Sequence, residues 1–282
     1  MSVTTGTLAV PGATLHYQVC GTGPVLLISQ SGEGDADRNN DLVARLVDSW
    51  TVVTYDRRGL SRSRLDEPGR GATMAEHADD VHRLLAALTD VPALMLGCSL
   101  GAVIGLHVAV EHPEQLRTLV AHEPVAPRLL PDDRRARHER ELAELQDLYA
   151  RAGLAATLPE IATTLGIDPA GADREPDLTP QPMTAQRVRN FDHFIRHDFT
   201  AILRDPLDLE ALRGVGTRIV PATGRTTPRS VFDHLAAAAL ATLLERPLQE
   251  APGGHNGNTT HPRAYAQWLR EVLDTAGRAP GR

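Results

Sequence analysis

The stretch ALMLGCSLGAVIGLHVAV, residues 93–110, decides the fold. Its first six residues form a continuous apolar run, which predicts a short strand buried on both faces. The residues from position 100 onward predict a helix that stops near Pro113. Between the two lies GCSLG, residues 97–101, a G-x-S-x-G motif in the strand–turn–helix setting that a nucleophile elbow requires. We therefore expect Ser99 to act as a nucleophile.

The residue types in this motif have a physical reason. A nucleophile at such an elbow sits in a strained turn, so small residues are needed two positions before and after it, here Gly97 and Gly101. The turn lifts the serine hydroxyl above the sheet. It also aims the N–H of Leu100 and the N-terminus of the helix at one spot, where they can stabilise an oxyanion.

Strand and helix patterns alternate on both sides of the motif. Residues 7–21 read as a hairpin, buried strands are predicted at 24–30, 51–56 and 116–124, and helical spacing appears around 42–47 and at 74–88. The alternation resumes late in the chain, with strands at 217–224 and 247–251. This order predicts a mostly parallel sheet with helices on both faces, and functional loops at the carboxyl ends of the strands.

The alternation is interrupted after Pro124. Residues 125–204 read as helices and loops, so we predict a helical lid inserted into a core formed by residues 1–124 and 205–282. One helical stripe of this insertion includes Phe191, Phe194 and Phe199, three of the four phenylalanines in the chain. We interpret the stripe as the lining of a substrate pocket, with plain core packing as the alternative.

Composition limits the partners. A formal net charge of −7 argues against nucleic acid or an anionic membrane as the main partner and leaves a small-molecule substrate. The N-terminus lacks the pattern of a signal peptide, and no apolar run approaches the ~18 residues of a membrane helix, so we expect a cytoplasmic protein. The oligomeric state stays open, a homodimer included.

Two further segments extend the pattern to nearly the whole chain. Together with YDRRGLSRS (residues 55–63) and GGHNGNTTHP (residues 253–262), the elbow resembles the α/β-hydrolase superfamily. The resemblance implies an α/β-hydrolase fold without a cofactor, with His255 as the general base for Ser99. His193 and His197 have the spacing of metal ligands, but no third ligand is apparent, and we expect no metal.

The chain departs from the superfamily pattern at the loop after the first buried strand. Gln30 and Ser31 replace the usual His-Gly pair. The resemblance implies that the second oxyanion donor is the backbone N–H of Ser31 or Gly32, and Gln30 could itself donate to a substrate oxygen. Cys98 stands where a histidine often precedes the nucleophile, and we expect a buried, unreactive thiol.

The acid is missing from its usual place. In ATGRTTP, residues 222–228, arginine and the threonines Thr226 and Thr227 occupy the positions where the superfamily carries Asp or Glu. Glu123, at the end of the strand beside the nucleophile strand, is the preferred substitute. Asp233 and Asp205 are weaker candidates because both fall in predicted helical or lid-joining segments, and a Ser–His dyad without an acid is the remaining alternative.

Two classes of function fit these features. The first is a lidded serine hydrolase that cleaves an ester, thioester or lactone of a small, partly apolar substrate through an acyl-Ser99 intermediate. The second is a non-hydrolytic enzyme on the same fold (a lyase, cyclase or cofactor-free haloperoxidase-like enzyme) or a ligand-binding protein. The replacements at Gln30-Ser31 and Thr226-Thr227 favour the second class, and fold alone does not separate the two.

Overall fold

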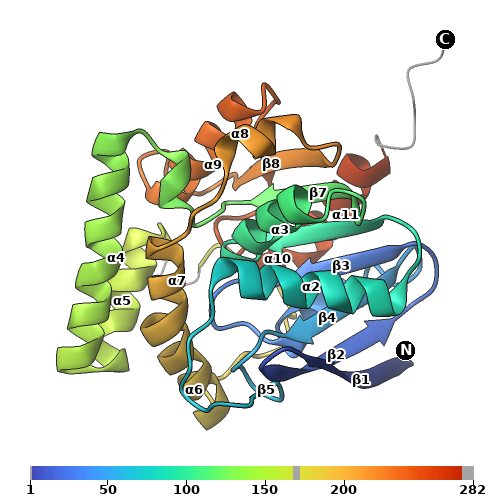
Figure 1. The fold of residues 1–282 in the computed structure, drawn as a ribbon, viewed down its shortest axis with the longest axis horizontal. Helices are drawn as coiled ribbons and strands as arrows, with labels where there is room; N and C mark the ends of the chain where they lie inside the picture. Colours follow the sequence, from blue (N-terminus) through green and yellow to red (C-terminus); the bar gives the residue numbers. More distant parts are fainter. Residues whose placement is uncertain (1, 168–171, 275–282) are drawn as a thin grey trace.

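A computed structural model describes residues 2–167 and 172–274 of the chain. Within these residues, nine strands form one sheet in the order β1-β2-β4-β3-β6-β7-β8-β9, and the short β5 pairs with β2 (Figure 1). The strands are β1 (Val3–Val10), β2 (Ala13–Cys20), β3 (Val25–Ser29), β4 (Thr51–Asp56), β5 (Arg64–Leu65), β6 (Ala93–Cys98), β7 (Leu116–His122), β8 (Arg218–Gly224) and β9 (Gln249–Ala251).

The sheet is mostly parallel, as predicted. The pairs from β4 through β3, β6, β7 and β8 to β9 are all parallel. Strands β1 and β2 form the expected antiparallel hairpin, and β2 also runs antiparallel to β4. The carboxyl ends of the parallel strands therefore meet at one edge, where loops from different strands can share a site.

Helices cover both faces of this sheet, which explains the continuous apolar runs. In β3, Leu26 and Ile28 face the core beneath α1 (Asn40–Val43) and α11 (Pro262–Asp274). Leu27 between them faces the opposite core, because successive side chains of a strand alternate. That second core lies under α2 (Met74–Leu88), α3 (Leu100–Glu111), α8 (Leu209–Gly214) and α9 (Phe232–Leu243).

Three short elements depart from the sequence-based expectation. The helix expected around residues 42–47 is only the four-residue α1, followed by turns. The 3-10 helix η1 (Ala36–Asn39) precedes it, and α10 (Gly257–Thr260) follows the histidine loop. Elements of a single turn carry too little periodicity to be recognised in a sequence.

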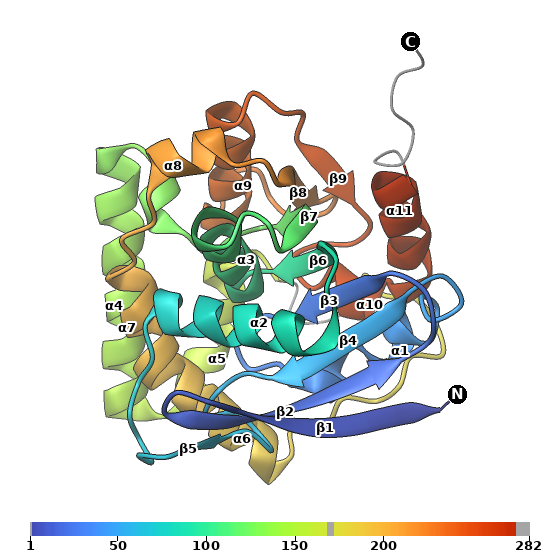
Figure 2. The same cartoon turned by 45° about the vertical axis from the view of Figure 1, so that its right-hand side comes forward.

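The segment between β7 and β8 has no strand among its described residues, but residues 172–184 form a loop outside any helix. It contains the 3-10 helix η2 (Pro127–Leu129), α4 (Asp132–Ala152), α5 (Leu154–Thr164), α6 (Ala185–His193), the π-helical turn η3 (Phe194–Asp198) and α7 (Phe199–Leu203). Helices α4 to α7 form a layer at the side toward which β3 and β6 point (Figure 2). Among the described residues, no helix has both the length and the apolar character that a bilayer crossing needs.

Candidate active site

The GCSLG turn places Ser99 in a strained conformation between β6 and α3. Its φ is 56° and its ψ is −116°, a combination that non-glycine residues rarely adopt. The two glycines permit the close packing around it. A Cβ on Gly101 would overlap the carbonyl oxygen of Ser29, and one on Gly97 would lie 2.6 Å from the Cα of Ala102. Strand and helix can approach this closely only because both positions lack a side chain.

Three backbone amides near this turn are candidates for an oxyanion hole. In the described part of the chain, the N–H groups of Ser31, Gly32 and Leu100 donate to no protein acceptor. Gly32 must be small for a separate reason, because a Cβ there would overlap the ring of Phe194. Unpaired donors at the end of β3 and at the start of α3 suit the binding of a developing negative charge.

Arg57 holds the loop that carries two of these amides. Its guanidinium donates to the carbonyl oxygens of Gln30 (3.3 Å), Ser31 (3.1 Å) and Gly32. It also forms a buried ion pair with Asp198 at 2.9 Å, in the π-helical turn η3. With the carbonyls fixed on the arginine, the amides of the same peptides are held in a defined orientation.

His255 and Glu123 meet as the sequence predicts. Nδ1 of His255, in the loop after β9, lies 2.8 Å from Oε2 of Glu123, which directly follows β7. The other carboxylate oxygen accepts from Thr223 Oγ1 at 2.7 Å and from the amide of Gly224 at 2.8 Å, both at the end of the neighbouring strand β8. Like Ser99, Glu123 has a positive φ, here 46°.

Asp233 also reaches this histidine, although the sequence made it a weaker acid candidate than Glu123. Its Oδ2 lies 2.7 Å from Nδ1 of His255, although the residue belongs to the first turn of α9. The two contacts differ in direction: the Glu123 contact is aligned as a hydrogen bond, whereas neither oxygen of Asp233 has an aligned partner among the described residues. We therefore infer that the Nδ1–H group of His255 donates its hydrogen bond to Glu123.

Burial and charge set the protonation of the three groups. Burial raises the pKa of Glu123, but the hydrogen bonds from His255 and Thr223 outweigh it and hold that pKa below its usual range. For Asp233 burial prevails, and its pKa is raised. Burial lowers the pKa of His255, but the carboxylates of Asp233 and Glu123 reverse this and raise it. Asp233 and His255 thus compete for one proton.

The other acid candidates lie elsewhere. Asp205 accepts hydrogen bonds from Nε2 of His107 at 2.7 Å and from the amide of Leu207. It makes no described hydrogen bond or ion pair with His255. Thr226 Oγ1 donates to Asp173 at 2.9 Å and makes no bond to the histidine.

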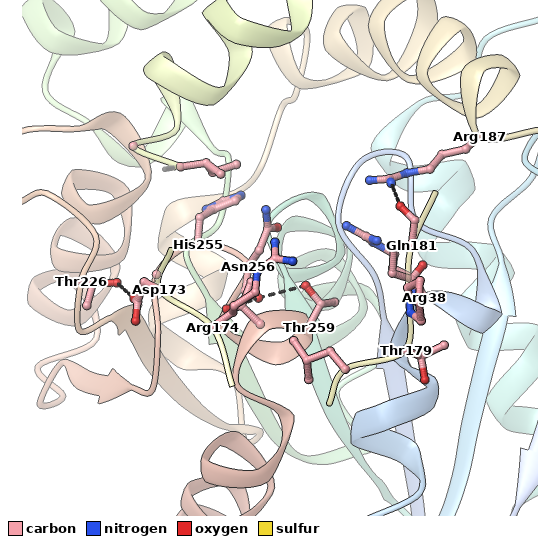
Figure 3. Close-up of a pocket in the computed structure, with 16 residues that line it drawn as sticks. Arg38, Asp173, Arg174, Thr179, Gln181, Arg187, Thr226, His255, Asn256 and Thr259 are labelled. Atoms are coloured by element: carbon pink, nitrogen blue, oxygen red, sulfur yellow. Dashed lines mark hydrogen bonds between the residues drawn. The ribbon is translucent and has the colours of Figure 1, made fainter. Parts of the chain in front are cut away.

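Two adjoining cavities open above the serine. The inner one, of about 160 Å³, is lined by Ser99 and His255 together. The outer one, of about 630 Å³, is lined by His255 and residues of the loop before α6 (Figure 3). No hydrogen bond joins the described side chains of Ser99 and His255, but both face the inner cavity. The residues common to both cavities are Arg38, Ile167, Arg187, His255 and Asn256.

The expected pocket residues divide into two groups. Phe191 and Phe194 line the inner cavity, together with Leu158, Ile161 and Leu165. Phe199 differs from the expectation: it packs edge-on against Phe194, with ring centroids 4.9 Å apart, and is absent from the described lining. Gln30 also differs. It is buried, and its Oε1 accepts from Asn258 at 3.0 Å.

Cys98 is a buried free thiol, and burial raises its pKa to about 12, so it stays protonated and unreactive. Among the described residues, two sets of side chains lie close enough to share an ion. One is Asp79, His82 and His112, and the other is the cluster of Glu123, Asp233 and His255 itself. His193 and His197 have rings 4.8 Å apart but belong to neither set.

Comparison with known proteins identifies the family of the chain. A family model described as alpha/beta hydrolase fold matches residues 24–144, and a curated relative matches almost the whole chain. The chain therefore belongs to the alpha/beta hydrolase fold family and is an enzyme of the hydrolase class. The relative is Uncharacterized hydrolase YraK of Bacillus subtilis (strain 168), 36% identical over 278 residues that cover 97% of each protein.

Solved structures resemble the fold over its full length. A hydrolase from Pseudomonas aeruginosa PA01 superposes with a TM-score of 0.73 at 22% identity, covering 95% of this chain and 98% of that one. The enol-lactonase from Burkholderia xenovorans LB400 superposes with a TM-score of 0.71 at 19% identity, covering 95% and 100%. At these identities the likeness shows the fold.

Proposed function

We propose that the protein hydrolyses an ester, thioester or lactone of a small, partly apolar substrate through an acyl-Ser99 intermediate. The observation that carries this proposal is the 2.8 Å hydrogen bond between His255 Nδ1 and Glu123 Oε2, made beside the cavity that Ser99 lines. An imidazole whose Nδ1 donates to a carboxylate has its Nε2 free to accept the proton of a serine hydroxyl.

The first half of the reaction acylates the serine. Ser99 Oγ attacks the substrate carbonyl carbon while His255 Nε2 takes the hydroxyl proton. The carbonyl oxygen becomes an oxyanion, for which the amides of Leu100 and of Ser31 or Gly32 are the proposed donors. The tetrahedral intermediate then collapses, the bond to the alcohol, thiol or ring oxygen breaks, and His255 returns the proton to that leaving group.

The second half releases the acid. His255 accepts a proton from water, the resulting nucleophile attacks the acyl carbon, and the bond to Ser99 Oγ breaks as the serine recovers its proton. Glu123 stays ionised throughout, because it orients the imidazole and stabilises its charged form without taking the proton.

Asp233 sets the resting protonation in this proposal. A neutral Asp233 with neutral His255 holds the same number of protons as an ionised Asp233 with a charged imidazole. Only the first arrangement leaves His255 able to act as a base. In this proposal Glu123 supplies the acid from the end of another strand. The absence of an acid at Thr226 and Thr227 then no longer favours a non-hydrolytic enzyme.

The helical segment fits the role of a lid. Its α5 and α6 supply Ile161 and Phe191 to the inner cavity, and its turn η3 supplies Phe194. This apolar wall suits an apolar acyl or alcohol group and excludes water from the acyl-enzyme. We propose residues 125–204 as the lid over a core formed by the rest of the chain.

Turnover of a chromogenic ester tests the function. Wild-type protein should hydrolyse 4-nitrophenyl butyrate with saturation, and a rapid-mixing burst should approach one 4-nitrophenolate per active site when deacylation limits the rate. Ser99→Ala should abolish both, while the exposed Ser49→Ala should match the wild type. Hydrolysis by Ser99→Ala at the wild-type rate would refute the acyl-serine mechanism.

A further inference from the structure

Arg38 is the one arginine at the inner cavity whose guanidinium donates no hydrogen bond to a residue within 2–167 and 172–274. It belongs to η1, and only 14% of its side chain is exposed. The carboxylate of Glu33 lies 3.7 Å away, within ion-pair range but beyond a hydrogen bond. Burial lowers the pKa of Arg38, and the carboxylates of Glu33 and Asp35 offset this only in part. A guanidinium offers five N–H donors, and leaving them unpaired in a sheltered place is costly.

Glu33 is shared between two arginines, and its hydrogen bonds come from Arg187 and not from Arg38. Nη2 and Nε of Arg187 both approach Oε1 of Glu33, at 2.7 and 3.2 Å. Arg187 also donates to the carbonyl oxygen of Gln181 at 2.8 Å. The hydrogen bonds of Glu33 are therefore directed to Arg187, and the N–H donors of Arg38 remain unpaired among the described residues.

The position of Arg38 relative to Ser99 indicates which kind of ligand the guanidinium could bind. Arg38 lines the inner cavity that also contains Ser99 and His255, and it extends into the outer one. In Figure 3, Arg38 and Arg187 stand on the side of the outer cavity that faces His255 and Asn256. Much of the remaining inner wall is aliphatic or aromatic. An arginine with unpaired donors in such a wall suits an anionic group on the molecule that reaches the serine.

We propose that Arg38 binds a carboxylate of the substrate, so that the enzyme acts on an ester, thioester or lactone carrying a free carboxylate beside the scissile bond. This inference rests on the proposed hydrolase function for the reaction, but the anion subsite itself does not. The fork of one unpaired guanidinium matches a planar carboxylate through two parallel hydrogen bonds. The rest of the substrate lies against Phe191 and Phe194.

The first test compares matched substrates. Mono-4-nitrophenyl adipate carries a carboxylate on the acyl side, and its methyl ester is the neutral counterpart. The acetate ester of 4-hydroxybenzoate carries the carboxylate on the leaving group, and methyl 4-acetoxybenzoate is its neutral counterpart. Wild-type protein should prefer the anionic member of one pair. The pair that shows the preference identifies the side of the scissile bond on which Arg38 acts.

Substitution assigns the preference to Arg38. In Arg38→Gln, the ratio of kcat/KM for the anionic over the neutral substrate should fall on the order of tenfold to a hundredfold, the range for a lost charged hydrogen bond. Arg38→Lys should retain part of the ratio. Arg134→Gln makes the same charge change on an exposed position of α4 and should keep the wild-type ratio. An equal ratio in Arg38→Gln and wild type would overturn the subsite.

A binding measurement separates failure of the subsite from failure of the hydrolase. Ser99→Ala protein should bind glutarate and not the neutral glutaramide in calorimetry, and adding Arg38→Gln should weaken glutarate at least tenfold. Thermal unfolding checks that the double variant is folded. Glutarate binding without hydrolysis of any ester would refute the proposed hydrolase function and support the carboxylate subsite. Hydrolysis of neutral esters with no glutarate binding would refute the carboxylate subsite and support the hydrolase function.

Discussion

Two carboxylates lie within 3 Å of the same nitrogen of His255, and their surroundings give them different roles. Glu123 accepts an aligned hydrogen bond from Nδ1 and is satisfied by Thr223 and Gly224, so its charge is stable in the buried site. Asp233 is close at 2.7 Å but has no aligned donor among the described residues. In the proposed mechanism, Glu123 orients the base and Asp233 adjusts the proton affinity of that base.

Removing each carboxylate should therefore have unequal effects on turnover. Glu123→Gln should lower kcat by about 10²- to 10⁴-fold, because the imidazole loses both its orientation and the stabilisation of its charged form. Asp233→Asn should lower kcat by less than about tenfold, because the hydrogen bond to Glu123 remains. Steady-state kinetics on a 4-nitrophenyl ester measure both variants. A larger loss in Asp233→Asn than in Glu123→Gln would reverse the assignment.

The pH profile should identify the role of Asp233 directly. Activity requires neutral His255, so kcat/KM falls as pH drops through the pKa of this group. The two carboxylates raise that pKa, which places the acid limb above the ordinary value of about 6.5. Asp233→Asn removes one of the charges that favour the protonated imidazole. Its acid limb should move to lower pH, and an unmoved limb would contradict the coupling.

At this scale the sequence predicted part of the site. Ser99 and Glu123 could be found because they directly follow β6 and β7, and His255 because it lies in a glycine-rich loop after β9, at the same edge of the sheet. Asp233 was ranked low because it lies in a helix, nine positions beyond Gly224, and only the tertiary path of α9 returns it to the histidine. The unpaired state of Arg38 depends on how Glu33 and Arg187 pair, which no local pattern encodes.

At the scale of elements, Arg57 connects the oxyanion loop after β3 with the π-helical turn η3. One buried guanidinium holds carbonyl oxygens of the loop and the carboxylate of Asp198. π-Helical turns occur often at functional sites. Here the turn also presents Phe194, whose ring lies against Gly32. Arg57 thus holds in place both the loop that carries the proposed oxyanion donors and the turn that forms one wall of the cavity.

Loss of this support should affect catalysis more than substrate binding. Arg57→Gln should lower kcat at least tenfold with a smaller change in KM, because the amides of Ser31 and Gly32 act on the oxyanion and not on the ground state. Arg58→Gln is the matched control: its guanidinium is equally buried and pairs with Asp80 at 2.6 Å, away from the loop. Both variants should lose stability, as broken buried ion pairs do. An equal fall of kcat in both would make the role of Arg57 purely structural.

The strands and long helices could be predicted because their patterns are long and regular. The bounds of β4, α2 and β6 agree with the expected ranges to the residue. The single-turn elements η1 and α10 could not, since their positions are fixed by contacts made elsewhere. The phenylalanine stripe illustrates the limit: its spacing shows a shared helix face, but the π-helical turn directs Phe199 behind Phe194.

At the scale of the whole molecule, the helical segment and the sheet share one apolar core. Leu142 of α4, Ile161 of α5 and Phe194 of η3 belong to the same buried cluster as Val103 of α3 and Leu119 of β7. The ion pair between Arg57 and Asp198 adds a buried polar link between the two parts. A helical segment joined in this way is part of the folding unit, and in the proposed function its surface toward the cavities admits the substrate.

This shared core predicts cooperative unfolding. Differential scanning calorimetry should give one transition, with a calorimetric enthalpy close to the van 't Hoff enthalpy. Asp198→Asn should lower the midpoint of that transition and leave it single. Two resolved transitions, with the earlier one sensitive to Asp198→Asn, would show that the helical segment unfolds independently of the sheet.

The central claim is that Ser99 is a nucleophile activated by His255. Intact-mass analysis after incubation with a fluorophosphonate tests it most directly, because this probe forms a covalent adduct only with an activated hydroxyl. We expect a single adduct on the wild-type protein, none on Ser99→Ala, and a much slower adduct on Glu123→Gln. An adduct of equal rate on Ser99→Ala, or none on wild type with either this probe or a smaller sulfonyl fluoride, would contradict it.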